Sequence, residues 1–399
     1  MPPRHSALGQ VLVIGFTQTI AWASTVYLVA IIAAPVGRTL ALPESAVYGA
    51  FSVALAITAL LGPSVGRAID RNGGRAMLAG SNLVIAGGLV LLAAAHDAVL
   101  LFTGWGVLGF GMAMGLYDTA FAALVRLHGQ AARGLITGVT LIAGFASTVG
   151  WPLSALLEDR FGWRATCAAW ALAQLALCLP LNLYAIPAVR PEPQRAGAGQ
   201  REDGGAGAPP ADPRGGARGE LALMGLFFAA TAFVTSAMAA HLPGLLLAAG
   251  AGGTAALGAA ALVGPAQVAA RTVEYLAARR FRFHPLITAR IATALHPLGG
   301  ALLWFTGGIP LGVSGFALLH GAGNGMITIA KGTLPLAVFG EAGYGRRVGV
   351  LSVLARALQA AAPFLFGLVL EGAGVHAAIA LSVGVSLAAL AALAALRAH

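Results

Sequence analysis

Residues 308–339 read GIPLGVSGFALLHGAGNGMITIAKGTLPLAVF, an apolar run that contains the only lysine of the chain. About 20 apolar residues suffice for a helix to cross a bilayer, and a longer run crosses with a tilt. Polar residues recur in this run at i, i+4, i+8 and i+11, namely His320, Asn324, Thr328 and Lys331. A helix places them on one stripe, and charges inside membrane spans normally face protein or a water-filled cavity. The run predicts a membrane helix with a cavity-facing stripe; the alternative is that Lys331 snorkels to the bilayer interface.

The composition is that of a polytopic membrane protein. Hydrophobic residues make up 58% of the chain and charged residues 10%, and the mean hydropathy is +0.83. These values exclude an ordinary soluble domain. The net charge of +10 comes mainly from arginines in short segments between apolar runs, which indicates membrane topology and not a nucleic-acid-binding face. Cys167 and Cys178 share one apolar run, so neither a disulfide framework nor a metal site is expected.

Twelve apolar runs are long enough to span a bilayer. We expect them at residues 8–34, 45–66, 75–95, 98–125, 134–157, 164–187, 220–249, 254–278, 284–307, 309–339, 348–371 and 374–397. Most arginines lie in loops on one side, and the opposite side holds only Arg38, Arg160 and Arg164. Because positive residues stay inside, both termini should be cytoplasmic. The segment 188–219, rich in Pro, Gly and charges, would be a cytoplasmic linker between halves 1–187 and 220–399.

The loop after the second run carries glycines, an acid and arginines at a fixed spacing: Gly66, Asp70, Arg71, Gly73 and Arg75. The pattern resembles the signature G-x-x-x-D-R-x-G-R-R of the major facilitator superfamily, with glycine at the first of the two final basic positions. In that family the acid and the basic residues latch the cytoplasmic side of the outward-open state. The resemblance covers essentially the whole chain. It implies an all-α membrane fold with twelve transmembrane helices in two pseudo-symmetric six-helix bundles.

Two further segments bear on the resemblance. Trp105-xxx-Gly109-x-Gly111 in the fourth run resembles the family pattern R-x-x-x-G-x-G, with tryptophan in the place of arginine. Arg271 and Glu274 close the eighth run at the position that corresponds to the latch motif of the first half. For this pair we expect a latch-like structural role, with substrate binding as the alternative.

The resemblance also implies that the first, fourth, seventh and tenth spans line a central cavity between the halves. Polar and aromatic residues at helical spacing in these spans support the same faces independently. Arg356, in the eleventh span, is either part of an anion site or a structural partner. For the tryptophan, glutamine and seventh-span histidine, ordinary helix packing is the alternative. The candidate cavity residues are Gln18, Trp22, Tyr117, Asp118, His241, His320, Asn324, Lys331 and Arg356.

Asp118 and Lys331 occupy corresponding positions in the two halves, each near the cytoplasmic end of its span. An ion pair between them would help to close the cytoplasmic side, and substrate or a proton would compete for either partner. The alternative is a permanent structural salt bridge. An acid inside the membrane makes Asp118 the expected proton-coupling residue.

The sequence carries no nucleotide-binding loop and no catalytic constellation, so neither a cofactor nor an enzymatic activity is expected. We expect a monomeric secondary transporter of the cell inner membrane that moves a small organic solute by alternating access, coupled to protons. Lys331, Arg356 and His320 would supply a positive field suited to an anion. One alternative is an efflux permease for drugs or toxic compounds, against which the absence of the GP-xx-GG ending from the fifth span counts. The other is a non-transporting sensor or lipid translocator on the same fold.

Overall fold

The computed structural model describes residues 6–72, 74–187, 216–281, 284–339 and 344–396. These residues form helices and connecting turns, without a β-strand among them. The first half contains α1 (Ala7–Ser24), α2 (Val29–Leu40), α3 (Glu44–Asn72), α4 (Gly74–Ala94), α5 (Ala98–Gly115), α6 (Tyr117–His128), a 3₁₀ turn (Gly129–Ala131), α7 (Ala132–Ala143), α8 (Ala146–Ala173), a π-helical turn (Gln174–Cys178) and α9 (Leu179–Ala185). The second half contains α10 (Gly216–Ala248), α11 (Gly253–Ala261), α12 (Val263–Phe281), α13 (Pro285–Thr306), α14 (Pro310–Phe339) and α15 (Tyr344–Ala395).

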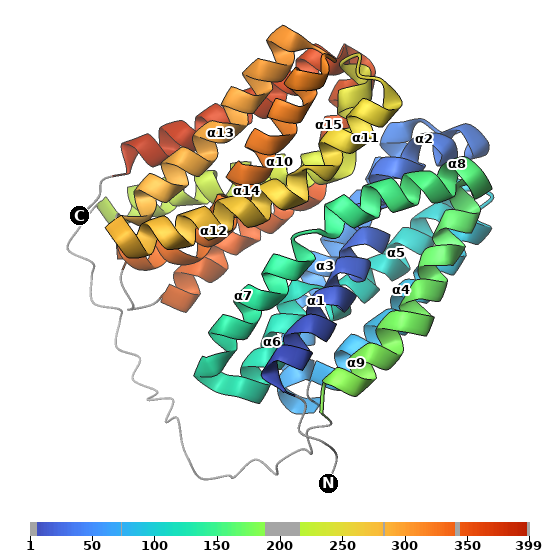
Figure 1. The fold of residues 1–399 in the computed structure, drawn as a ribbon, viewed down its shortest axis with the longest axis horizontal. Coiled ribbons are helices and arrows are strands. Elements are labelled where there is room, and N and C mark those ends of the chain that lie inside the picture. The colour runs from blue at the N-terminus through green and yellow to red at the C-terminus, as the bar shows by residue number, and fades with distance from the viewer. Residues whose placement is uncertain (1–5, 73, 188–215, 282–283, 340–343, 397–399) are drawn as a thin grey trace.

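The helices gather into two bundles, α1–α9 in one and α10–α15 in the other (Figure 1). Within the described residues, nine stretches are long and apolar enough to cross a membrane. Two of them, Gly134–Tyr184 and Val350–Ala395, are about twice the length of one crossing. Each contains a glycine with left-handed, non-helical backbone, Gly162 (φ 78°) and Gly374 (φ 80°), where the chain turns back. Dividing these stretches at the glycines and adding α14 is consistent with the twelve expected crossings.

Several of the expected spans are broken within the membrane region. The first is interrupted between α1 and α2, and the fourth between α5 and α6 at Leu116, whose backbone is extended (φ −83°, ψ −171°). The break gives Asp118 a place in the first turn of a new helix, α6. A carboxylate is favoured there because helix N-termini carry partial positive charge.

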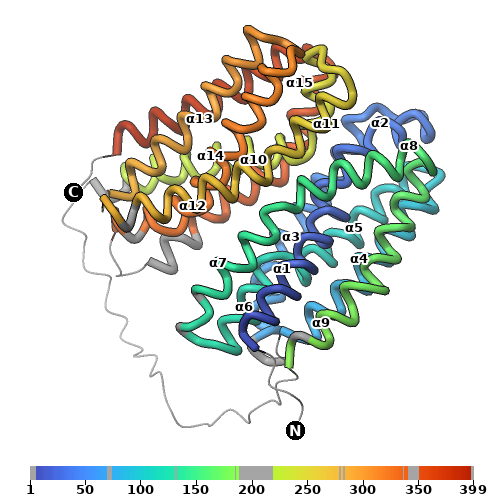
Figure 2. The backbone as a smooth tube through the Cα atoms, in the orientation of Figure 1, coloured from blue at the N-terminus to red at the C-terminus, as the bar shows by residue number. Residues whose placement is uncertain are grey.

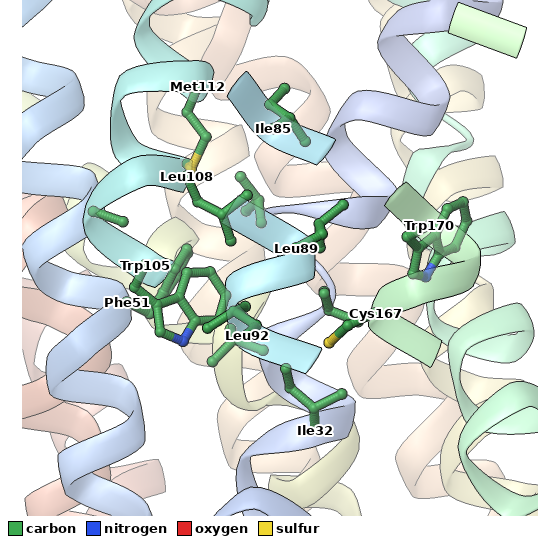
Figure 3. Packing of buried hydrophobic residues seen from close by; sticks show 14 of the residues in the cluster. Ile32, Phe51, Ile85, Leu89, Leu92, Trp105, Leu108, Met112, Cys167 and Trp170 are labelled. Atoms are coloured by element: carbon green, nitrogen blue, oxygen red, sulfur yellow. The ribbon is translucent and has the colours of Figure 1, made fainter. Parts of the chain in front are cut away.

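The core of the first bundle shows how glycine lets membrane helices approach one another. Trp105 is fully buried against Phe51, with ring centroids 5.1 Å apart, among leucine and isoleucine side chains of α4 and α5 (Figure 3). Trp105 is therefore a packing residue in a neutral core. On α4, a Cβ added to Gly88 would lie 2.8 Å from Leu108 Cγ and 3.0 Å from the Leu108 backbone nitrogen. Small residues at such positions allow the close van der Waals contact that holds helices together in lipid.

A buried polar network ties the same bundle together away from the cavity. Asn82 Nδ2 donates to Gln174 Oε1 (2.7 Å), and Gln174 Nε2 donates to Ser24 Oγ (2.8 Å). Asn182 Nδ2 donates to Asn82 Oδ1 (2.9 Å), and Thr17 Oγ1 donates to Asn182 Oδ1 (3.0 Å). The network joins α1, α4, the π-helical turn and α9, so these buried amides satisfy one another instead of binding a ligand.

The two bundles contact each other along two antiparallel helix pairs. In the first pair, α3 runs beside α15: Ser45 N donates to Glu371 Oε1 (2.8 Å) and Phe364 N donates to Ser52 Oγ (3.2 Å). In the second pair, Thr148 Oγ1 of α8 donates to the carbonyl of Ala261 in α11 (2.8 Å). These contacts lie at the end of the molecule where α2 and α11 meet (Figure 1). The bundles stand apart at the other end, where α1 begins and α15 ends, and the tube in Figure 2 shows the same divergence.

The glycine packing between α4 and α5 gives a matched stability test. Gly87→Ala adds a methyl group where no other atom lies within 4 Å, whereas Gly88→Ala drives it into Leu108. Alanine is the better helix former by about 0.5–1 kcal/mol, so Gly87→Ala should leave stability unchanged or slightly higher. Gly88→Ala should lower it by about 1–3 kcal/mol through overpacking. Thermal unfolding in one detergent measures both, and equal shifts would contradict the packing described here.

Candidate functional site

A cavity of about 430 Å³ lies between the two bundles, a volume within the range of small-molecule sites. Its wall combines α1, α3, α5, α6, α7 and α8 of the first bundle with α10, α12, α14 and α15 of the second. The close contact between α3 and α15 reaches Gly62 of α3, at the edge of the cavity. A Cβ on Gly62 would lie 2.8 Å from Arg356 Nη1. One turn farther, Gly66 lines the cavity, and a Cβ there would meet no atom within 4 Å. The bundles therefore part just beyond Gly62.

The first bundle contributes an aromatic wall. Trp22 and Tyr117 have ring centroids 5.0 Å apart, and Tyr27 packs edge-on against Trp151 at 5.1 Å. All four residues line the cavity. Phe121 supports this wall from α6, stacked on Tyr117 with an interplanar angle of 13°. Such a wall offers large apolar faces to a ring or an alkyl group.

The second bundle contributes a polar wall centred on Arg271 of α12. Its guanidinium donates to two carbonyls, that of Gly325 on α14 (3.3 Å) and that of Thr140 on α7 (3.1 Å). It also contacts the side-chain oxygens of Gln267 (3.5 Å) and Thr328 (3.4 Å). All of these acceptors are neutral, and no carboxylate pairs with Arg271 in the described part of the chain. Arg271 thus brings an uncompensated positive charge into the cavity wall and bridges both bundles.

Asn324 and His320 of α14 extend the polar wall. Thr235 Oγ1 of α10 donates to Asn324 Oδ1 (2.9 Å), which fixes the amide. The His320 ring lies 4.8 Å from the ring of His296, a buried residue of α13. His296 approaches Gly323 so closely that a Cβ there would lie 2.6 Å from its Nε2. Sequence reasoning did not single out His296, although a histidine inside an apolar span was a usable signal.

One ion pair joins the bundles at the cavity. Arg356 Nη2 of α15 lies 3.1 Å from Asp118 Oδ2 of α6. The pair is accessible, with 40% of the Arg356 side chain and 76% of the Asp118 side chain exposed, so solvent screens it strongly. The expected pairing of Asp118 with Lys331 is therefore wrong: Asp118 pairs with Arg356.

Lys331 occupies a second, smaller cavity within the C-terminal bundle. Its Nζ lies 5.9 Å from the centre of the Phe228 ring on α10. Arg356 and Gln359 belong to the linings of both cavities and stand between Lys331 and the central one. The stripe from His320 to Lys331 is continuous on the helix, but α10 and α15 cover its last member.

Two further residues expected in the cavity lie elsewhere. Gln18 is 1% exposed, and its Nε2 donates to the carbonyl of Gly115 (2.7 Å), which the break after α5 leaves without its usual helical partner. His241 is 1% exposed, with Nε2 2.8 Å from the carbonyl of Pro363 and its ring 3.8 Å from that of Tyr48. It belongs to the contact between the bundles at their closed end, beside Gly367.

The residues expected in the cavity and present in its wall are Trp22, Tyr117, Asp118, His320, Asn324 and Arg356. Their role in binding a substrate stays a prediction. Sequence reasoning missed other members of the wall, among them Tyr27, Trp151, Gln267 and Gln359. Gln267 and Gln359 are polar residues inside apolar runs, and that signal was available in the sequence.

The expected latch residues divide into three groups. Asp70, Arg71 and Gly73 lie outside the residues whose side chains the structure describes. Gly66 lines the cavity, and Arg75 Nε is buried without a hydrogen-bond partner among the described residues. Glu274 accepts a hydrogen bond from Thr288 Oγ1 (3.3 Å) and makes no ion pair with Arg271. The latch-like role expected for Arg271 stays a prediction; its guanidinium also belongs to the cavity wall.

Two solved structures with the same fold are distant from this chain in sequence. A bacterial homologue of the human lysosomal transporter Spinster, in an inward-facing and occupied conformation, is similar at 16% identity with a TM-score of 0.64; the match covers 96% of this chain and 93% of that one. The nucleoside transporter NupG, crystallised as a single-residue mutant, is similar at 14% identity with a TM-score of 0.72, over 98% of both chains. At these identities the likeness establishes the fold alone. No curated protein matches the sequence.

The sequence also matches a family model directly. The model described as Major Facilitator Superfamily matches residues 11–330, which is most of the chain. Its agreement with the helical fold and with both solved transporters leaves one assignment: the chain belongs to the major facilitator superfamily and is a multi-pass membrane transporter.

Proposed function

We propose that this protein is a secondary transporter that moves a small organic anion through the cavity between its bundles by alternating access. The observation that carries the proposal is Arg271, a cation in the cavity wall with no carboxylate partner among the described residues. A guanidinium presents parallel N–H donors that match a carboxylate or phosphate group. The hydrogen-bond acceptors of the Arg271 guanidinium are all neutral, and an anionic ligand would form stronger, charge-assisted hydrogen bonds in their place.

The aromatic wall opposite Arg271 supports a more specific substrate. A cavity of about 430 Å³ with rings on one bundle and cationic and amide groups on the other suits an anion that also has a ring or an apolar body. Such a solute would contact both bundles at once. Ligands that touch both halves bias a two-state transporter because their contacts differ between its conformations.

The ion pair at the cavity supports proton coupling. Asp118 and Arg356 lie on different bundles, at the point where the bundles part. Protonation of Asp118 removes the charge that attracts Arg356, and an anionic solute competes for the same guanidinium. We assign Asp118 the coupling role and Arg356 the role of a partner that either a proton or the solute releases.

We further propose that the structure is an inward-facing state in the cell inner membrane, of a protein that acts as a monomer. The bundles stand apart at the end where α1 begins and α15 ends, which the arginine distribution places in the cytoplasm. Export of amphipathic compounds is the second candidate, and the aromatic wall formed by Trp22, Tyr27, Tyr117 and Trp151 favours it.

The anion hypothesis is tested with ligands that differ only in charge. Aromatic carboxylates should stabilise the purified protein against heat, and their neutral amides should not, because only a ligand that binds the folded state stabilises it. Arg271→Gln should weaken carboxylate binding about 10- to 100-fold, which corresponds to about 1.5–3 kcal/mol for a charge-assisted hydrogen bond. Arg271→Lys should retain part of it. Equal stabilisation by acids and amides, or an unchanged affinity in Arg271→Gln, would rule out Arg271 as the anchor, that is, the residue that binds the anionic group.

The ion pair is tested by a double-mutant cycle in thermal unfolding. Asp118→Asn combined with Arg356→Gln should show a coupling energy of about 0.2–1 kcal/mol, small because both side chains are accessible. Asp118→Asn combined with Lys331→Gln is the control and should be additive. Coupling in the control cycle together with additivity in the first cycle would contradict the Asp118–Arg356 pair and indicate that Asp118 pairs with Lys331. In proteoliposomes, Asp118→Asn should retain exchange of solute while losing accumulation driven by a pH gradient.

A further inference from the structure

The chain's only lysine lies in a cavity of its own. This second cavity has a volume of about 330 Å³ and is lined by α10, α14 and α15. Its lining consists of Phe228, Ala232, Lys331, Gly332, Ser352, Ala355, Arg356 and Gln359. Apolar side chains form one part of the wall, and the remainder offers an ammonium, a guanidinium, an amide and a hydroxyl.

The charges of this cavity do not balance. Lys331 and Arg356 are both cations, and no acid is found among the described residues of the lining. Lys331 Nζ lies 5.9 Å from the centre of the Phe228 ring, which attracts a cation but does not neutralise its charge. Asp118 offsets Arg356 from the side of the central cavity, at 3.1 Å. A net positive charge therefore remains on Lys331, within a helix where an uncompensated charge is costly.

We propose that this cavity is a second anion site, which binds a single carboxylate or phosphate group between Lys331 and Arg356. An ammonium acts as a compact point charge for an oxyanion, and the guanidinium adds directed donors. The Gln359 amide and the Ser352 hydroxyl provide further donors in the same wall. The apolar patch of Phe228, Ala232 and Ala355 would pack against the organic part that carries the anion.

Arg356 gives the site a connection to the central cavity. It belongs to both linings and pairs with Asp118 across the bundle interface. An anion that engages Arg356 from the side of Lys331 competes with Asp118, so occupation of the second site loosens the ion pair between the bundles. The site does not depend on Arg271 and therefore stands independently of the proposed central anchor.

The shared chemistry, one oxyanion group, has two sources. A soluble organic anion reaches such a site from water, whereas an anionic phospholipid reaches it from the bilayer, where basic pockets between membrane helices bind headgroups. The experiment has to separate these sources, and the unique lysine makes that possible. A neutral acylating ester modifies only Lys331 and the N-terminal amine, so each is read separately by peptide mass spectrometry.

Acylation of Lys331 is followed in detergent with benzoate or inorganic phosphate, against sodium chloride of equal ionic strength. In a second arm it is followed in phosphatidylcholine nanodiscs with and without phosphatidylglycerol. Occupation should slow acylation of Lys331 about tenfold at about ten times the dissociation constant, while the N-terminal amine reacts as before. Protection by soluble anions identifies a solute site, and protection only by phosphatidylglycerol identifies a headgroup site. Either result supports an anion site.

Three variants decide where the protecting anion sits. Protection should persist in Arg271→Gln, which removes the central anchor, and should be lost in Arg356→Gln. Arg38→Gln removes an exposed arginine at the opposite end of the molecule and serves as the charge control, with protection unchanged. All variants are first checked for monodispersity by size exclusion. The proposal is overturned if neither soluble anions nor phosphatidylglycerol protect Lys331. It is overturned equally if protection is lost in Arg271→Gln and retained in Arg356→Gln, because the effect would then come from the central cavity.

Discussion

The structure depends on how far the two bundles remain in contact. Helix α3 follows α15 from Ser45, at Glu371, to Gly62, at Arg356, and the bundles part beyond that point. In lipid no hydrophobic force pulls helices together, so contacts of this kind rest on close packing and hydrogen bonds. The hydrogen bonds between α3 and α15 are partly accessible, and such an interface can break at one end while it forms at the other. The position of the cavity, its accessible ion pair and its bridging arginine all follow from this partial contact.

The cavity divides its chemistry between the bundles. Rings from the first bundle line the same cavity as the guanidinium of Arg271 and the amide of Asn324 from the second. A solute that combines an apolar body with an anionic group would link the two walls, and neither wall alone would hold it. This division connects recognition with movement, because a ligand that spans both bundles responds to any change in their separation.

Much of the fold could be predicted from the sequence because membrane spans depend on local composition. The apolar runs, the Gly66–Arg75 motif and the arginine asymmetry need no tertiary information. The site was less predictable, because whether a side chain faces the cavity depends on the neighbouring helices. Lys331 shares a stripe with His320, yet α10 and α15 cover it. Gln18 turns toward Gly115 because α5 stops there, a break that hydropathy does not reveal.

Arg271 illustrates the opposite error. Its span is not one of the four expected to line the cavity, and its position, which corresponds to that of the latch motif in the first half, indicated a latch-like structural role. In the structure the long side chain reaches Thr140 on the other bundle and thereby enters the interface. A family rule that assigns whole helices to a cavity therefore misses residues whose reach exceeds the spacing between helices.

The central claim is that the two ends of the bundle interface open alternately. Spin labels at Ala131 and Phe281 report the separation of the bundles at the end where α1 begins and α15 ends. Labels at Arg38 and Thr254 report their separation at the opposite end. All four side chains are exposed. Electron–electron distance distributions are measured for both pairs in nanodiscs across a pH series and with increasing benzoate. The account predicts that every condition that shortens the first distance lengthens the second. Distances that vary independently, or that both stay fixed under all conditions, would contradict it.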